Sequence, residues 1–180
     1  MASASERRRF GAVVLVVLIL DQASKFAAEA LLPRYVGLSV IGDFFQLRLV
    51  YNPGAAFGLH VGEHSRWVFM ALSILALVVL GSMLRQTRSG DWLRLYSLAS
   101  ICAGAAGNLI DRIRSGRGVV DFLDFTFGSY HFPTFNIADS AVTVGAVALA
   151  ISLWNEGKGQ QGVPAQPPPE ASAETPPAGA

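Results

Sequence analysis

The sequence predicts a mainly α-helical membrane protein built as a bundle of four transmembrane helices. Of its 180 residues, 52% are hydrophobic and only 15% are charged, whereas soluble domains usually carry about 25% charged residues. The mean hydropathy is +0.41. Four apolar runs approach the roughly 20 residues that a helix needs to cross a bilayer. This composition argues against a soluble enzyme.

The first span is expected over residues 10–31, where the apolar run Phe10–Leu20 continues into DQASKFAAEALL. The basic cluster Arg7–Arg9, this run and the small residues near Ala28 also resemble a cleaved signal peptide. A continuous helix is favoured because Asp21 and Lys25 lie four residues apart with the acid first, which is the stabilising order in a helix. We therefore expect a retained span.

The other three spans are expected at residues 67–84, 92–112 and 137–154. Residues 67–84 contain no charged side chain, and residues 137–154 contain one, Asp139, in the first turn. Residues 92–112 are rich in Ala, Gly and Ser. Because small residues allow membrane helices to approach closely, this span is expected at the centre of the bundle.

The loops and the C-terminal segment have a different composition. Two β-rich runs flank the turn-like Gly42-Asp43, which predicts a small hairpin on the membrane surface, and the third loop contains the β-like run VVDFLDF. Residues 155–180 hold six of the nine prolines. We expect this Pro/Gly/Ala-rich tail to be disordered and cytoplasmic, because it cannot bury a core.

Four spans place both termini on the same side of the membrane. Basic residues divide equally between the two sides, seven and seven. The N-terminal cluster Arg7–Arg9 decides the orientation, because the first helix usually dominates topology, and it predicts cytoplasmic termini.

With this topology, the polar side chains of the spans all fall near the outer leaflet. They are Asp21, Lys25, Asn108, Asp111, Arg112, Asn136 and Asp139. Each also has a structural explanation; Asp139, for example, suits the first turn of a helix begun by Asn136. Together they indicate a one-sided polar pocket, because ionisable groups within spans are costly and usually functional.

The chemistry expected of this pocket depends on aspartate. Neither GxSxG nor HExxH occurs, and the single cysteine, Cys102, excludes a Cys-based zinc cluster. No metal or cofactor is expected, and a net charge of +1 does not suggest a nucleic-acid partner.

Two close carboxylates can share one proton and activate a water. Asp139 is the first candidate, and its partner is Asp121 or Asp124. If VVDFLDF is a strand, these two side chains point to opposite faces of it, so only one of them can meet Asp139. Position alone does not choose between them.

Five ordered blocks make the chain resemble the bacterial lipoprotein signal peptidases, also called signal peptidase II. They are DQASK (21–25), NPGAAFG (52–58), AGAAGNLIDR (103–112), GVVDF (118–122) and FNIADS (135–140). The third block departs from the family pattern, which usually opens with two glycines, because its first position is Ala103.

The resemblance implies an intramembrane aspartyl protease of the plasma membrane, with a single peptidase domain over residues 1–154. It would cleave diacylglyceryl-modified prolipoproteins on the N-terminal side of the modified cysteine and would be inhibited by globomycin. The implied dyad is Asp121 and Asp139. The implied supporting residues are Asp21, Lys25, Asn52, Gly54, Asn108, Arg112 and Asn136. The family fold adds an extracytoplasmic β-cradle, here residues 35–58 and 118–126, and a short surface helix. We expect a monomer, with membrane lipid as its surroundings.

Two other classes of function remain open. A small transporter or channel subunit would use Asp21, Lys25, Asp111, Arg112 and Asp139 as an ion path, but such sites usually lie near the midplane of repeated halves. A membrane assembly factor would bind a partner through the hairpin and keep its aspartates for structure.

Overall fold

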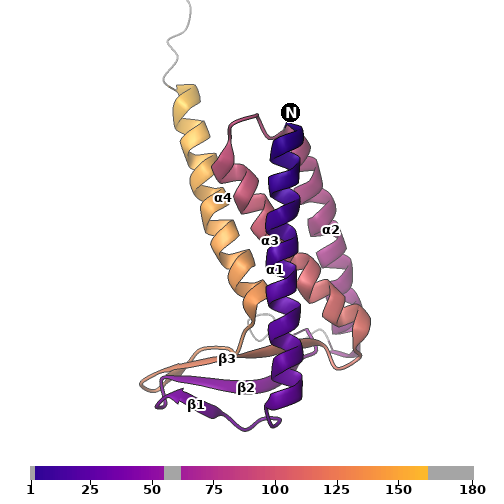
Figure 1. Cartoon of the computed structure of the whole chain (residues 1–180), viewed down its shortest axis with the longest axis vertical. Coiled ribbons are helices and arrows are strands. Elements are labelled where there is room, and N and C mark those ends of the chain that lie inside the picture. The colour runs from indigo at the N-terminus through magenta and orange to yellow at the C-terminus, as the bar shows by residue number, and fades with distance from the viewer. Residues whose placement is uncertain (1–2, 55–61, 162–180) are drawn as a thin grey trace, which may run out of the picture.

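The computed structural model of the protein describes residues 3–54 and 62–161. Its helices α1 (Ala4–Leu31), α2 (Ser65–Gln86), α3 (Trp92–Arg114) and α4 (Ile137–Gln161) form an elongated bundle (Figure 1). All four are long and apolar enough to cross a membrane. The start of α1 and the end of α4 lie at one end of the bundle, and the strands lie across the other end.

Helix α3 is the centre of the bundle and packs against the other three helices. Its buried face includes Ala103, Gly104 and Gly107, which confirms the position predicted from its small residues. By contrast, α1 and α2 expose large apolar side chains such as Leu15 and Val78. These surfaces suit contact with lipid, since lipid tails are as apolar as the side chains themselves.

Gly104 allows the close approach of α3 and α4. A Cβ at this position would meet the backbone oxygen of Ala138 and, at 2.6 Å, the side chain of Val142. We expect Gly104→Ala to lower the free energy of unfolding by about 1–3 kcal/mol through overpacking, measured as thermal unfolding in detergent. Gly81→Ala is the matched control on α2, where nothing lies within 4 Å. An unchanged Gly104→Ala unfolding temperature would contradict this account of the packing.

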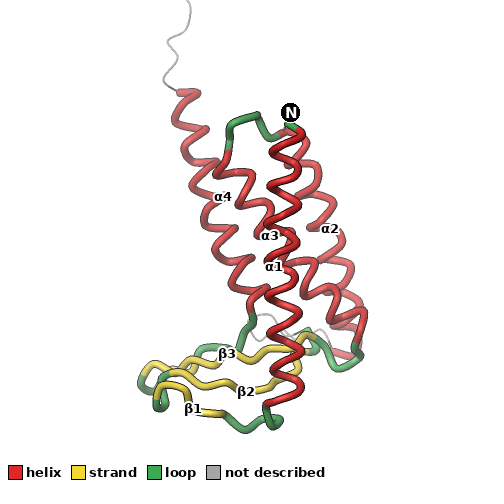
Figure 2. Tube along the Cα trace, in the orientation of Figure 1, coloured by secondary structure: helices red, strands yellow, loops and turns green. Residues whose placement is uncertain are grey.

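The strands form one antiparallel sheet in the order β1-β2-β3-β4 (Figure 2). They span Leu38–Ile41, Phe45–Asn52, Val119–Phe127 and Tyr130–His131. The hairpin around Gly42-Asp43 is confirmed, with Gly42 at a φ of 49°, and VVDFLDF is a strand as predicted. Strand β4 was not expected.

Part of the expected cradle and surface helix lies outside the described residues. This applies to residues 55–61, which include the end of the 35–58 segment and of the NPGAAFG block. The described residues just before α2 form a single 3-10 turn, Gly62–His64.

All four helices are longer than the predicted spans, and α1 and α4 show the largest differences. Helix α1 begins at Ala4 instead of residue 10, because Ser3 and Glu6 form a capping box and Glu6 also accepts the Gly90 N–H at 2.7 Å. Helix α4 continues to Gln161, so the tail boundary expected at Asn155 is wrong. An ion pair of 3.0 Å between Arg94 and Glu156 holds the added turns against α3. Residues 162–180 of the expected tail lie outside the described residues.

Candidate active site

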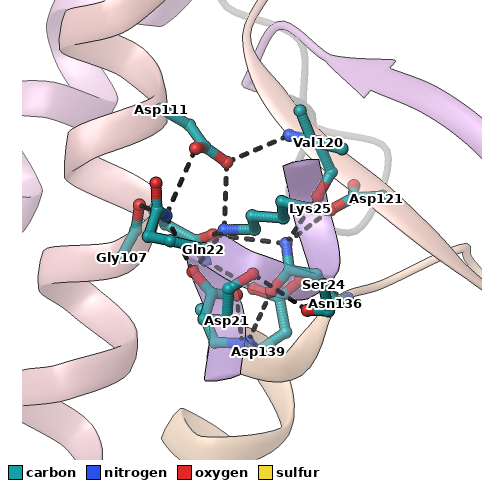
Figure 3. A network of polar contacts seen from close by, with 12 residues as sticks. Asp21, Gln22, Ser24, Lys25, Gly107, Asp111, Val120, Asp121, Asn136 and Asp139 are labelled. Carbon is teal, nitrogen blue, oxygen red and sulfur yellow. Dashed lines mark hydrogen bonds and ion pairs between the residues drawn. The ribbon is translucent and has the colours of Figure 1, made fainter. Parts of the chain in front are cut away.

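A network of polar side chains lies where the helices meet the sheet (Figure 3). The contributing elements are α1, α3, β3 and the first turn of α4 with the residue before it. The network includes Asp21, Lys25, Asn108, Asp121, Asn136 and Asp139. The clustering predicted from the topology of the spans is therefore present, although the set extends over more than 100 positions of the chain.

Lys25 is the centre of charge in this network. Its side chain is 0% exposed, and its Nζ lies 2.8 Å from Asp21 Oδ2, 2.9 Å from Asp111 Oδ2 and 2.9 Å from Asn108 Oδ1. An ammonium group has three donors, so these three acceptors satisfy it. Asp21 in turn accepts the backbone N–H of Ala138 at 2.9 Å, which ties α1 to the start of α4.

Asn108 connects Lys25 to Asp139. Because its Oδ1 accepts from the ammonium, its Nδ2 is free to donate to Asp139 Oδ1, at 2.7 Å. Gly107 is next to Asn108, and a Cβ on it would lie 2.5 Å from Asp21 Oδ2. The glycine therefore gives α1 the room to bring its acid against α3.

Asn136 contacts both candidate carboxylates. Its Nδ2 donates to Asp121 Oδ1 at 2.6 Å, and its backbone N–H donates to Asp139 Oδ2 at 3.2 Å. Asp139 returns a hydrogen bond from its backbone N–H to Asn136 Oδ1 at 2.9 Å. This reciprocal pair caps α4, so the capping explanation considered for Asp139 is correct and coexists with its place in the network.

Asn52, at the end of β2, holds the second oxygen of Asp121. Its Nδ2 donates to Asp121 Oδ2 at 3.2 Å, while its Oδ1 accepts the N–H of Gly54 at 3.0 Å. Gly54 has a φ of 123°, and a Cβ there would lie 2.7 Å from the ring of Phe69. Only glycine adopts this conformation without strain, so Gly54 supports the orientation of Asn52.

Asp124 lies on the opposite face of β3 from Asp121, as strand alternation requires. It is buried and pairs with Arg48 at 2.9 Å and with His131 at 2.7 Å. These partners belong to the sheet. Asp124 therefore stabilises the sheet, whereas Asp121 belongs to the network.

The surroundings of Asp121 favour its neutral form. Burial, together with the charge of Asp139, raises the pKa of Asp121 to about 7. The hydrogen bonds from Asn52 and Asn136 and the charge of Lys25 act in the opposite direction. A carboxyl group with such a pKa can donate a proton near neutral pH, which an ordinary aspartate cannot.

Arg112 lies beside the two carboxylates without an ion pair to either among the described residues. Its Nη1 donates to the Asn108 carbonyl at 3.1 Å, and its guanidinium lies 5.6 Å from the ring of Phe69. Its Nε is buried and has no hydrogen-bond partner in the described part of the chain. The guanidinium thus retains a donor near the two carboxylates.

Two network residues were not predicted as supporting residues of the site. Asp111 was placed in the one-sided polar pocket and in the transporter alternative but not among the supporting residues, and Gln22 was not singled out. Gln22 donates to Asp21 at 3.0 Å and to the Gly107 carbonyl at 3.3 Å. Asp111 could also have been predicted as a supporting residue, because it follows Asn108 by three residues and shares its helix face. Within residues 3–54 and 62–161, no cluster of three His, Cys, Asp or Glu side chains is suited to a metal ion.

Comparison with known proteins finds a matching family model and relatives that share its description. Residues 13–155 match the family model described as signal peptidase (SPase) II. A lipoprotein signal peptidase of Burkholderia ambifaria is 48% identical over 153 residues, covering 83% of this chain and 89% of that protein. One from Desulforapulum autotrophicum is 42% identical over 140 residues, covering 76% and 86%.

The fold also matches solved structures. One, described as a bacterial membrane enzyme, superposes with a TM-score of 0.77 at 28% identity, covering 88% of this chain and 94% of the other. The sequence and structure matches, together with the four apolar helices, show that the chain belongs to the signal peptidase II family of multi-pass inner-membrane peptidases.

Proposed function

We propose that the chain is an intramembrane aspartic endopeptidase that removes the signal peptide from diacylglyceryl-modified prolipoproteins, cutting on the N-terminal side of the modified cysteine. Membership of the signal peptidase II family supports the part of this proposal that makes the chain a membrane protease acting on lipoprotein signal peptides. The observation that carries the aspartic mechanism is the pair of carboxylates, Asp121 and Asp139, held by one residue, Asn136.

In the proposed reaction, Asp139 is the base and Asp121 is the acid. The ionised form of Asp139 is stabilised by donors from Asn108 and Asn136 and by the N-terminus of α4. It takes a proton from water, whose oxygen attacks the scissile carbonyl carbon. Asp121, whose raised pKa of about 7 lets it keep a proton up to near neutral pH, donates that proton to the carbonyl oxygen. When the tetrahedral intermediate collapses, the peptide C–N bond breaks and the proton held by Asp139 passes to the leaving amine. One hydroxyl of the intermediate returns its proton to Asp121 as it becomes the new carbonyl, which restores both carboxyl groups to their starting states.

The remaining polar residues support this pair. Lys25 and Asp21 fix Asn108, and Gly54 fixes Asn52. The Nε of Arg112 is available to a substrate carbonyl. The acyl chains of the substrate would stay in the bilayer as its cysteine reaches the site.

The proposed orientation places the sheet end of the bundle outside the cytoplasm. The site lies at this end, and the Arg7–Arg9 cluster lies in the first turns of α1 at the other end (Figure 1). The positive-inside rule then assigns the termini to the cytoplasm. We propose a monomer, because the four spans and the sheet supply every residue of the network.

The proposal predicts how cleavage depends on pH. Asp121 acts as the acid only while protonated, and its pKa is raised to about 7. We therefore expect kcat/KM to fall as the pH rises above about 7, and to fall again at low pH when both carboxyls are protonated. The measurement is a rate profile from pH 4 to pH 9. A rate that stays constant from pH 6 to pH 9 would show that Asp121 is not the acid.

Cleavage by the purified protein tests the proposal directly. A diacylglyceryl-modified prolipoprotein is incubated with the full chain in detergent, with and without globomycin, and the unmodified precursor serves as a control substrate. We expect cleavage of the modified precursor alone and its inhibition by globomycin. If well-folded protein does not cleave, the proposal fails and the transporter and assembly-factor alternatives return.

A further inference from the structure

Asp111 is a fully buried carboxylate of α3 that contacts Lys25 of α1 and the backbone of β3 (Figure 3). Its Oδ2 lies 2.9 Å from Lys25 Nζ and accepts the backbone N–H of Val120 at 3.2 Å. Gln22 Nε2 approaches its other oxygen at 3.4 Å. A charge buried this completely costs free energy of desolvation. Its contacts therefore define what it does for the site.

The first contact leads to Asp121. Val120 directly precedes Asp121 on β3, and both of its backbone polar groups are held by side chains. Asp111 accepts its N–H, and Asn136 Nδ2 donates to its carbonyl at 3.2 Å. Val120 pairs with Tyr51 of β2, and the register of β2 shifts just beyond Asp121, between Val50 and Leu47. Asp111 thus holds, from α3, the backbone directly before Asp121.

The second contact leads to Asp139. Asp111 and Asp21 hold the ammonium of Lys25 from two sides, and its third donor reaches Asn108 Oδ1. This contact turns Asn108 Nδ2 toward Asp139. Removing Asp111 would release one side of Lys25 and so loosen the amide that orients Asp139.

We propose that Asp111 is a positioning residue for the cleavage reaction, holding Asp121 through Val120 and Asp139 through Lys25 and Asn108. This inference rests on the proposed function and deepens it. Asp111 acts through these neighbours and does not touch the substrate.

Asp111 also balances the charge near the dyad. The charged groups around it are Asp21 and Lys25 of α1, Arg112 and Arg114 of α3, and Asp139 of α4. Beyond them, Glu29 of α1 pairs with Arg114, and Arg66 of α2 donates to the Arg112 carbonyl. The charge of Lys25 lowers the pKa of Asp121, and Asp111 offsets part of that charge. With the carboxylate gone, Lys25 acts more strongly, the pKa of Asp121 falls, and Asp121 loses its proton at a lower pH.

The test compares Asp111→Asn with wild type and with Asp124→Asn in the prolipoprotein assay. Asp124 is the matched control, since it is also a buried acid paired with basic side chains, but on the far face of β3. For Asp111→Asn we expect kcat to fall about 10- to 100-fold, as for a small displacement of reacting groups. KM should change less than about threefold. The alkaline limb of the rate profile should move to lower pH by roughly half a unit or more. For Asp124→Asn, the alkaline limb of the rate profile should stay at its wild-type pH, and kcat should stay within about threefold of the wild-type value.

A second measurement does not depend on activity. Hydrogen–deuterium exchange at the Val120 amide should be faster in Asp111→Asn than in wild type, and unchanged in Asp124→Asn. If Asp111→Asn does not fold, Asp111→Glu replaces it. Because Asp111→Glu keeps the charge but displaces Val120, we expect a lower kcat with the alkaline limb at its wild-type pH.

The outcomes separate the two proposals. If wild type cleaves, and Asp111→Asn keeps the wild-type kcat and alkaline limb, the role of Asp111 is overturned and the proposed function stands. Equal amide exchange at Val120 in wild type and variant would also overturn it. If folded wild type does not cleave, both proposals fail.

Discussion

Asp121→Asn and Asp139→Asn are each expected to lower kcat for prolipoprotein cleavage by about 10³-fold or more. An asparagine has nearly the shape of an aspartate but cannot exchange a proton in the pH range of the enzyme. Each variant therefore keeps the packing around Asn136 and loses either the acid or the base. The measurement is single-turnover cleavage of the lipid-modified precursor, with folding checked by circular dichroism and thermal unfolding.

The double variant and a strand-face control sharpen this prediction. Asp121→Asn combined with Asp139→Asn should be hardly slower than either alone, because two groups that act as a unit are not additive. Asp124→Asn changes an acid only three positions from Asp121 but on the other face of β3, so its kcat should stay within about threefold of wild type. An active Asp121→Asn, or an inactive but folded Asp124→Asn, would show that the dyad is wrongly assigned.

Lys25→Met is expected to lower the free energy of unfolding by roughly 3–5 kcal/mol, the usual cost of removing one partner from a buried ion pair. Lys25 lies between Asp21 and Asp111, and all three side chains are 0% exposed. Methionine fills much of the same volume but leaves two carboxylates without their shared cation. Thermal unfolding in detergent should therefore begin at a clearly lower temperature.

The control is the same change at an exposed position. Lys158 lies in the last turn of α4, exposed and 5.3 Å from the ring of Trp154, so Lys158→Met should change stability by less than about 0.5 kcal/mol. Adding Asp111→Asn to Lys25→Met should recover part of the loss, since one unpaired charge is then removed. If Lys25→Met unfolds at the wild-type temperature, the ammonium of Lys25 does not stabilise the fold.

The ends of helices were predicted less well than their centres. The apolar runs predicted the spans because a bilayer demands a minimum length of apolar helix. The bilayer does not set where a helix stops beyond its surface. Glu6 begins α1 early by accepting a hydrogen bond from Gly90, and Glu156 extends α4 by pairing with Arg94. Both partners lie more than 60 positions away in the chain, so local sequence could not predict either end.

The sequence by itself determined the class of protein, the side of the bundle on which the polar residues gather, and the alternation that separates Asp121 from Asp124. These follow from hydrophobic length, span direction and strand period, which are all local properties. Only the tertiary structure decided that Asn136 contacts both carboxylates, that Lys25 orients Asn108, and that Asp111 holds Val120. The physical reason is that a hydrogen bond depends on the distance and angle between two groups, and for segments distant in the chain, packing of the helices and sheet sets both.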